Sequence, residues 1–371
     1  MKILSVIGTR PEAVKMAPIA RLLARTAGVE SRVCVTAQHR QMLDQVLSLF
    51  DIEPDYDLDL MRENQSLAQL SASIFTRLEP VFADFKPDWV LAQGDTTTVA
   101  ITSLLAYYHR IKFGHVEAGL RTYDKWQPFP EEINRRVAGV TADFHFAPTQ
   151  WAKQNMLREG IDERSIMVTG NTVIDALKFA SKQRAPRQTV HLLTQLKLRK
   201  KRLILVTAHR REHFGKPMEA ICNALIRLAK RGDVEIVYPV HLNPNVQEPA
   251  NRLLNRVEHI TLLPPLDYLP LVHLMKHAAL ILTDSGGIQE EGPFFGIPTL
   301  VLRQVTERPE GVKAGTLRLV GTNASRIVRE ASQLLDDKAA YAEMARAVNP
   351  YGDGYAAEKI IQILLKGAEK Q

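Results

Sequence analysis

Two stretches of the sequence show the same alternation of short apolar runs with longer segments of helical character. In the first stretch the apolar runs lie at residues 1–8, 33–37, 89–92, 112–116, 144–147 and 166–169. In the second they lie at residues 203–206, 235–238, 259–263, 280–282 and 299–302. Short apolar strands separated by helices of ten or more residues are typical of βαβ units and a parallel sheet. The sequence therefore predicts two doubly wound α/β domains.

The boundary between the domains is predicted from the place where this alternation stops. Residues 183–202 are rich in basic residues and proline, and the segment 197–202 alone carries five positive charges. We expect a first domain at 1–185, a basic linker at 186–201 and a second domain at 202–371, since 371 residues suit about two domains. The final helix, at about residues 354–366, has no assigned domain, and one option is that it packs back on the first.

Charge and cysteine content leave several classes of partner open. The chain has 48 Lys and Arg against 41 Asp and Glu, a net charge of +7, which suits nucleic acid, a membrane surface or a small anion. No apolar run approaches the roughly 20 residues that span a bilayer, and the N-terminus lacks the features of a signal peptide. Cys34 and Cys222 lie in separate apolar runs and are expected to be reduced core residues. We expect a cytoplasmic protein, and the basic linker is interpreted as solvated rather than as a nucleic-acid site.

Polar residues that follow the predicted strands of the first domain are candidates for chemistry, because ligands bind at the carboxyl ends of such strands. Arg10 and Lys15 follow the first strand at the start of a helix and suit an anion, although a plain capped turn explains them equally well. Three acids, Asp95, Glu117 and Glu131, follow later strands or loops and are candidate general acids or bases. Any one of them alone is more often a helix cap or a member of an ion pair.

In the second domain a strand runs into Ser285, Gly286 and Gly287, followed by Glu290 and Glu291. Glycines at a helix start let a phosphate approach the backbone, and a glutamate one turn later suits a ribose diol. This pattern favours a nucleotide site over a turn with solvated glutamates, without choosing between the two acids.

A histidine pair follows the first strand of the second domain. The spacing of His209 and His213 superficially suits zinc, but the residue order differs from the zinc-protease motif and no cysteine is near, so no metal is predicted. His209, at the strand end, is the candidate for contact with a ligand, and His213 is expected to face solvent.

Taken together, these segments resemble the non-hydrolysing UDP-N-acetylglucosamine 2-epimerase family, in particular its bacterial, enterobacterial-type members. The resemblance runs in order along nearly the whole chain, through the segments 8–18, 36–40, 94–98, 114–122, 170–175, 209–212, 239–244, 283–291, 306–310 and 349–354. It implies two Rossmann-like domains in a glycosyltransferase-B-like arrangement with an interdomain cleft, and no added metal or nicotinamide cofactor. It also implies reversible conversion of UDP-N-acetylglucosamine to UDP-N-acetylmannosamine, a precursor of cell-surface polysaccharide, through elimination of UDP, a 2-acetamidoglucal intermediate and re-addition.

The resemblance also assigns residues. It implies catalytic roles for Asp95, Glu117, Glu131 and His209, without saying which acid removes or returns the proton. Residues implied to bind the substrate are Arg10, Lys15, Ser285, Gly286, Gly287, Glu291 and Arg308, so that Glu291 is preferred to Glu290 for the ribose. Some relatives bind a second UDP-sugar as an activator, and Gln38, Gln41, Arg210 and His241 match that site, together with Glu131.

Two alternatives remain open at this point. The first is a 2-epimerase of a UDP-sugar modified at C3 or C6, and the second is a glycosyltransferase of the same architecture, which would need an acceptor. Relatives suggest a homodimer, with a UDP-sugar as the small-molecule partner and neither nucleic acid nor membrane.

Overall fold

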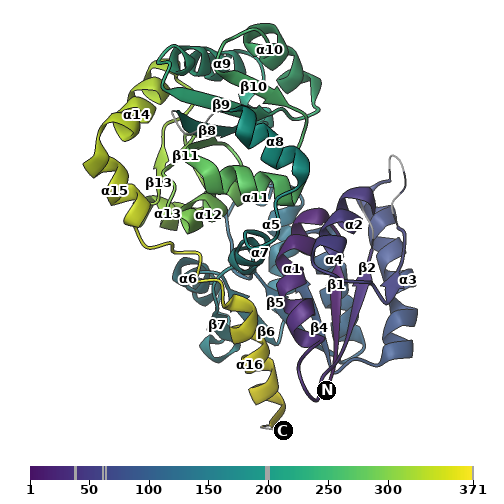
Figure 1. The fold of residues 1–371 in the computed structure, drawn as a ribbon. Helices are drawn as coiled ribbons and strands as arrows, with labels where there is room; N and C mark the ends of the chain where they lie inside the picture. Colours follow the sequence, from purple (N-terminus) through teal and green to yellow (C-terminus); the bar gives the residue numbers. More distant parts are fainter. Residues whose placement is uncertain (37–39, 61, 63–64, 197–200, 370–371) are drawn as a thin grey trace. The chain divides into compact units, whose positions relative to one another are not determined.

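The computed structural model describes residues 1–36, 40–60, 62, 65–196 and 201–369, without the side chains of 40–42 and 368–369. Two compact units are present (Figure 1). The first comprises Met1–Lys178 and Tyr351–Gln371, and the second comprises Phe179–Pro350. The chain therefore leaves the first unit, builds the whole second unit, and returns.

The first unit is built on a seven-stranded sheet in the order β3-β2-β1-β4-β5-β6-β7. Its strands are β1 (Lys2–Ile7), β2 (Glu30–Val35), β3 (Tyr56–Asp57), β4 (Trp89–Gln93), β5 (Lys112–Val116), β6 (Phe144–Ala147) and β7 (Ile166–Val168). All ladders between these strands are parallel. Its helices are α1 (Arg10–Leu23), α2 (Arg40–Leu49), α3 (Leu67–Phe85), α4 (Thr97–Tyr108), α5 (Glu131–Thr141), α6 (Gln150–Arg158), α7 (Thr172–Ala180) and α16 (Ala356–Glu369).

The second unit has a six-stranded parallel sheet in the order β10-β9-β8-β11-β12-β13. Its strands are β8 (Arg202–Thr207), β9 (Val234–Pro239), β10 (Ile260–Leu263), β11 (Ala278–Thr283), β12 (Thr299–Val301) and β13 (Leu317–Leu319). Its helices are α8 (Arg187–Gln195), α9 (Lys216–Ala229), α10 (Pro244–Leu254), α11 (Tyr268–His277), α12 (Gly286–Glu291), α13 (Pro309–Lys313), α14 (Ala324–Asp336) and α15 (Lys338–Arg346).

The central strands form because their apolar runs are buried on both faces, as parallel sheets require. All of β4 is buried, and so are the middle residues of β8. Cys34 and Cys222 are free thiols inside these two cores, as predicted. The prediction of two doubly wound domains is confirmed.

Several boundaries differ from those expected. The segment predicted as a linker contains α8, since residues 187–195 place apolar side chains at helical spacing, and the contact division falls earlier, at Lys178. Residues 197–200 of the basic cluster lie outside the described residues. The short strands β3 and β13 were not predicted, because two or three residues carry too little pattern.

The C-terminal helix α16 belongs to the first unit, where it packs beside α1 (Figure 1). Asp175 of α7 fixes its start by accepting hydrogen bonds from the backbone N–H groups of Ala356 (3.2 Å) and Ala357 (2.9 Å). Asn171 N–H donates to the carbonyl of Tyr351 at 2.7 Å. The sequence did not assign the final helix to a domain, and these contacts place it in the first unit.

Each sheet has one point where the strand order reverses. In the first sheet β1 lies between β2 and β4, and in the second β8 lies between β9 and β11. The connections from β1 and β4 leave on opposite sides of the sheet, so a crevice opens outside the carboxyl ends of these two strands. The same argument applies to β8 and β11. Both sets of predicted site residues follow these strands.

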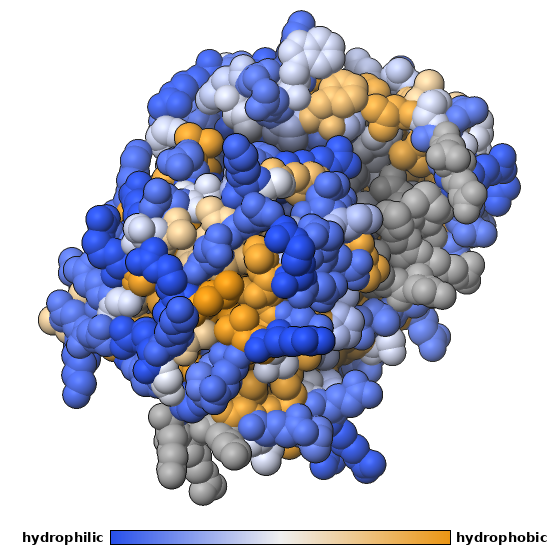
Figure 2. Space-filling model, turned by 90° about the horizontal axis from the view of Figure 1, so that it is seen from above, coloured by the Kyte–Doolittle hydropathy of each residue, from blue (hydrophilic) through white to orange (hydrophobic). Residues whose placement is uncertain are grey.

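No helix in the described part of the chain is long and apolar enough to span a bilayer. On the face drawn in Figure 2, apolar residues reach the surface between hydrophilic ones.

Candidate active site

The turn after β1 is tightly built. Thr9 caps α1 in a capping box with Glu12, whose Oε2 accepts hydrogen bonds from Gly8 N–H at 2.5 Å and Thr9 N–H at 3.3 Å. A Cβ at Gly8 would lie 2.6 Å from Oγ1 of Thr98 on the neighbouring α4, so only glycine fits. This turn fixes the start of α1, which carries Arg10 and Lys15.

Glu117 is held at the end of β5 by two donors. Lys15 Nζ lies 2.5 Å from its Oε2, and Gln93 Nε2 donates to the same oxygen at 2.7 Å. Both members of the ion pair are largely buried. The backbone of Glu117 is left-handed, with φ of 62°, which is unfavourable for a residue other than glycine. Such strain often occurs at functional positions.

Asp95 follows β4, next to β5 in the sheet. Its Oδ2 lies 2.9 Å from Nε and 2.7 Å from an Nη atom of Arg135 on α5. The buried His115 ring lies 2.7 Å from the carbonyl oxygen of Gly94, and burial lowers the pKa of His115 to about 4. The neutral ring therefore donates through Nε2 to Gly94 and fixes the turn that presents Asp95.

Glu131 is the first residue of α5 and is half-buried. Within the described residues it makes no hydrogen bond or ion pair. It lies four residues before Arg135 on one face of the helix, and Arg135 contacts Asp95. The structure therefore brings Asp95, Glu117 and Glu131 to the same edge of the first sheet.

In the second unit Ser285 is the N-cap residue of the short helix α12 and lies two positions after the end of β11. A Cβ at Gly286 would lie 2.8 Å from an Nη atom of Arg308, so glycine is required there, whereas Gly287 has open space around it. Arg308 Nε donates to Glu290 at 2.6 Å. The guanidinium is thus held over the glycine turn, as a group that receives an anion would be.

The two glutamates of α12 are both buried, so neither is a solvated surface residue. Glu290 is an ion-pair partner of Arg308. Glu307 also contacts Arg308, and although burial raises its pKa, Arg303 and Arg308 bring the pKa down to about 2.

His209 follows β8 and is half-exposed. Its ring stacks on that of His241, with centroids 5.4 Å apart. Arg210 donates through Nε to the carbonyl of Asp284 at 3.3 Å. The structure therefore brings three predicted residues of the second unit to one edge of its sheet.

The expectation for His213 is wrong. Its side chain is 7% exposed, and Nδ1 lies 3.0 Å from Oδ2 of Asp284. The ring is buried because it contacts Asp284, which lies 71 residues further along the chain. The sequence around His213 does not indicate this contact. The described residues contain no group of three or more His, Cys, Asp or Glu arranged to hold a metal ion.

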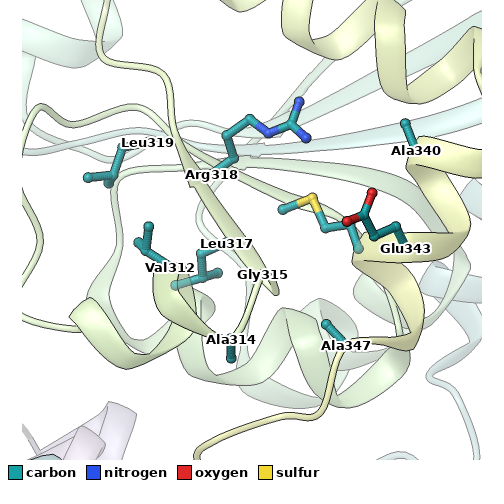
Figure 3. A pocket seen from close by; sticks show the side chains of 10 residues that line it. Val312, Ala314, Gly315, Leu317, Arg318, Leu319, Ala340, Glu343 and Ala347 are labelled. Atoms are coloured by element: carbon teal, nitrogen blue, oxygen red, sulfur yellow. The ribbon is translucent and has the colours of Figure 1, made fainter.

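Two predicted residues cannot be placed in full. Gln38 lies outside the described residues, and Gln41 belongs to α2 but its side chain is not described. A cavity of about 460 Å³ lies elsewhere, among α13, β13 and α15 (Figure 3). Arg318 and Glu343 are its charged lining residues, and no predicted site residue lines it.

The supporting residues were missed from the sequence. They are Gln93, His115, Arg135 and Asp284. Asp284 directly follows a strand, so the rule that selected Asp95 would have selected it as well. Arg135 carries only a helical spacing from Glu131, which no rule marks as functional.

Two parallel, doubly wound units with polar side chains at the carboxyl edges of their sheets define a two-domain Rossmann-like protein. Residues 21–365 match the model of a family described as UDP-N-acetylglucosamine 2-epimerase. The chain belongs to this family.

Known relatives match over the full length. A UDP-N-acetylglucosamine 2-epimerase of Yersinia pestis is 56% identical over 98% of each chain. The crystal structure of UDP-GlcNAc 2-epimerase from Neisseria meningitidis bound to UDP-GlcNAc is 48% identical, with a TM-score of 0.89 over 99% of this chain and 100% of that one. The enzyme of Methanocaldococcus jannaschii, in complex with UDP-GlcNAc and UDP, is 33% identical, with a TM-score of 0.81 over 99% of this chain and 100% of that one.

Proposed function

We propose that this protein epimerises UDP-N-acetylglucosamine at C2, giving UDP-N-acetylmannosamine for cell-surface polysaccharide. The observation that carries the proposal is the group of three acids at one sheet edge, Asp95, Glu117 and Glu131, in a chain of this family. Inverting C2 requires a proton to leave one face and another to arrive on the opposite face, which calls for more than one acid–base group.

The proton on C2 is not next to a carbonyl group, so its direct removal is difficult. The proposed route is elimination: a base takes the C2 proton, a C1–C2 double bond forms, and the bond from C1 to the diphosphate oxygen breaks with its electrons going to UDP. Re-addition of UDP to the glucal, with protonation of C2 from the other face, gives the epimer. The departing diphosphate gains negative charge, which nearby cations stabilise.

The roles follow from the surroundings of each group. Glu117 is positioned by Lys15 and Gln93 and is the more rigid acid, whereas Glu131 has no described partner to hold it. Asp95 accepts a hydrogen bond from the guanidinium of Arg135 on α5. We assign these three acids to proton transfer on the sugar, and Arg10 and Lys15 to its diphosphate.

The second unit is assigned to the nucleotide. Ser285, Gly286 and Gly287 are proposed to receive phosphate, with Arg308 above the turn and His209 at the next strand end. Glu291 is proposed to accept hydrogen bonds from the ribose. Relatives solved with UDP-GlcNAc or UDP support a UDP-sugar as the ligand of this protein.

Arg210 and His241 are proposed to contribute to an activating site, together with Gln38, Gln41 and Glu131. His241 stacks on His209, so a second UDP-sugar at His241 would adjoin the first. A sigmoidal dependence of rate on UDP-N-acetylglucosamine, changed to a hyperbolic one in His241→Ala, would support this role.

The deciding experiment is incubation with UDP-N-acetylglucosamine alone in deuterated water. We expect a manno product that carries deuterium at C2, detected by proton NMR. No deuterium at C2 and no manno product would refute the proposal. Product formation without an acceptor also separates an epimerase from a glycosyltransferase, and parallel assays with C3- or C6-modified UDP-sugars define the substrate.

We also propose a homodimer in the cytoplasm. Helices α4 and α5 pack together and expose large apolar side chains, including Tyr107, Tyr108 and Val140, which is 86% exposed. A second copy of the chain would cover such a face. Light scattering should give twice the chain mass, and Tyr108→Glu with Val140→Glu should give the monomer.

A further inference from the structure

One buried carboxylate joins the two turns that carry the nucleotide residues. Asp284 is fully buried at the end of β11, and its backbone N–H donates to the carbonyl of Thr207 on the adjacent strand β8. Its Oδ2 accepts hydrogen bonds from the backbone N–H groups of His209 and Arg210, both at 2.9 Å. The side chain is thereby fixed in direction, because three donors, including His213, converge on one oxygen.

The other oxygen of this carboxylate is not satisfied. Among the described residues no group donates a hydrogen bond to Oδ1 of Asp284, which is a costly condition for a buried charge. Nδ1 of His209 lies 3.5 Å from this oxygen. That distance is slightly too long for a good hydrogen bond, and catalytic contacts commonly shorten only when a ligand is bound.

Among the described charged groups around His209, Asp284 is the one that stabilises the protonated, positively charged form of its ring. The other charged or titratable groups that face the ring are His241, Arg210 and His213, and each of them disfavours a further positive charge. Burial lowers the pKa of His209, and Asp284 opposes that effect. Burial raises the pKa of Asp284, but His213, His209 and the two backbone donors hold it below its usual range, so the carboxylate stays charged.

We propose that Asp284 is a positioning residue that acts through His209: it holds a hydrogen on Nδ1 of that ring and supports the doubly protonated ring when a diphosphate binds at Nε2. The inference rests on the proposed function, in which His209 meets the diphosphate. A carboxylate on one ring nitrogen commonly sets the proton on the other. Asp284 therefore lets His209 donate to UDP as negative charge develops there.

The test is ¹⁵N NMR of histidine-labelled full-length protein at pH 8. Without ligand we expect the Nδ1–H form of His209, and with UDP-N-acetylglucosamine we expect both nitrogens protonated. The diphosphate diester of this probe does not itself titrate near that pH. In Asp284→Asn the amide oxygen keeps the backbone donors and the NH₂ group faces Nδ1. The ring should change to the Nε2–H form and take up no proton on binding.

His213→Asn is the matched control, because His213 contacts Asp284 through Oδ2, the oxygen that does not face His209, and its replacement keeps a donor. It should leave the Nδ1–H form of His209 unchanged. We expect Asp284→Asn to lower kcat by about 10- to 100-fold, as for comparable supporting residues. An Nε2–H ring in the wild-type protein, or an unchanged ring in Asp284→Asn, would overturn the inference. The expected NMR pattern without any epimerisation would count against the proposed function and not against the role of Asp284.

Discussion

At the scale of single residues, the first prediction concerns the strained acid on β5. Glu117→Gln keeps the shape of the side chain but removes its ability to take a proton. We expect turnover to fall by about 100-fold or more, with UDP affinity unchanged within a few fold, measured by NMR assay and calorimetry.

Glu163→Gln, at an exposed glutamate far along the chain, is the control for this substitution. Turnover close to that of wild type in Glu117→Gln would remove Glu117 from the proposed acid set.

A second residue-scale prediction concerns pH. Burial raises the pKa of Glu12 from 4.5 to about 7, although hydrogen bonds from Thr96, Gly8 and Thr9 lower it. A raised pKa means that the folded protein holds this proton more tightly than the unfolded chain does. The stabilising effect is complete below pH 4.5 and is lost as the pH rises to about 7, in total about 3 kcal/mol.

Glu12→Gln cannot ionise, so its stability should not show this loss. The three tryptophans, at 89, 126 and 151, all lie in the first unit, so urea unfolding followed by fluorescence reports on that unit. Between pH 5 and pH 8 we expect the free energy of unfolding of the wild type to fall relative to that of Glu12→Gln. Glu53→Gln, at an exposed site, is the control, and parallel curves for wild type and Glu12→Gln would disprove the prediction.

At the scale of elements, the turns after β1 and β4 are in direct contact. Gly8→Ala would place a methyl group 2.6 Å from Thr98 Oγ1 and 3.0 Å from Glu12 Oε2. The turns must separate, which displaces both Arg10 and Asp95. A displacement of about 1 Å can cost about 100-fold in rate, so we expect at least a tenfold loss of kcat.

Thr98→Ala removes the hydroxyl that the new methyl group would meet. The double variant Gly8→Ala/Thr98→Ala should therefore recover part of the lost rate, which is the signature of two residues in contact. Additive losses in the double variant would show that the two turns are not coupled in this way.

The elements also show what the sequence can and cannot predict. Strands such as β5 and β6 were predicted at their observed bounds, because the apolar runs that form them are local. The candidate acids Asp95 and Glu117 were found because they follow strands closely. The supporting contacts were not, since His213 and Asp284 are 71 residues apart and Asp95 and Arg135 are 40 apart. Contacts between residues far apart in the sequence, such as these two, depend on how the strands are ordered in the sheet.

At the scale of the whole molecule, the first unit needs the end of the chain. Helix α16 packs on α1, and Asp175 fixes its first turn. Removing residues 351–371 should expose the apolar face of α1 and lower the urea midpoint reported by tryptophan fluorescence. The second unit, Phe179–Pro350, should keep its own midpoint, followed by circular dichroism. Equal losses in both units, or no loss in either, would contradict this division.

The return of the chain to the first unit also has a consequence for synthesis. A ribosome that has completed residues 1–178 must still translate the entire second unit before α16 emerges. At typical rates of elongation this takes on the order of ten seconds or more. During that time the unit with the three acids lacks a helix of its core, and the second unit is complete before that helix emerges. A chain that ends just after residue 350 would therefore carry a complete second unit and a first unit without α16.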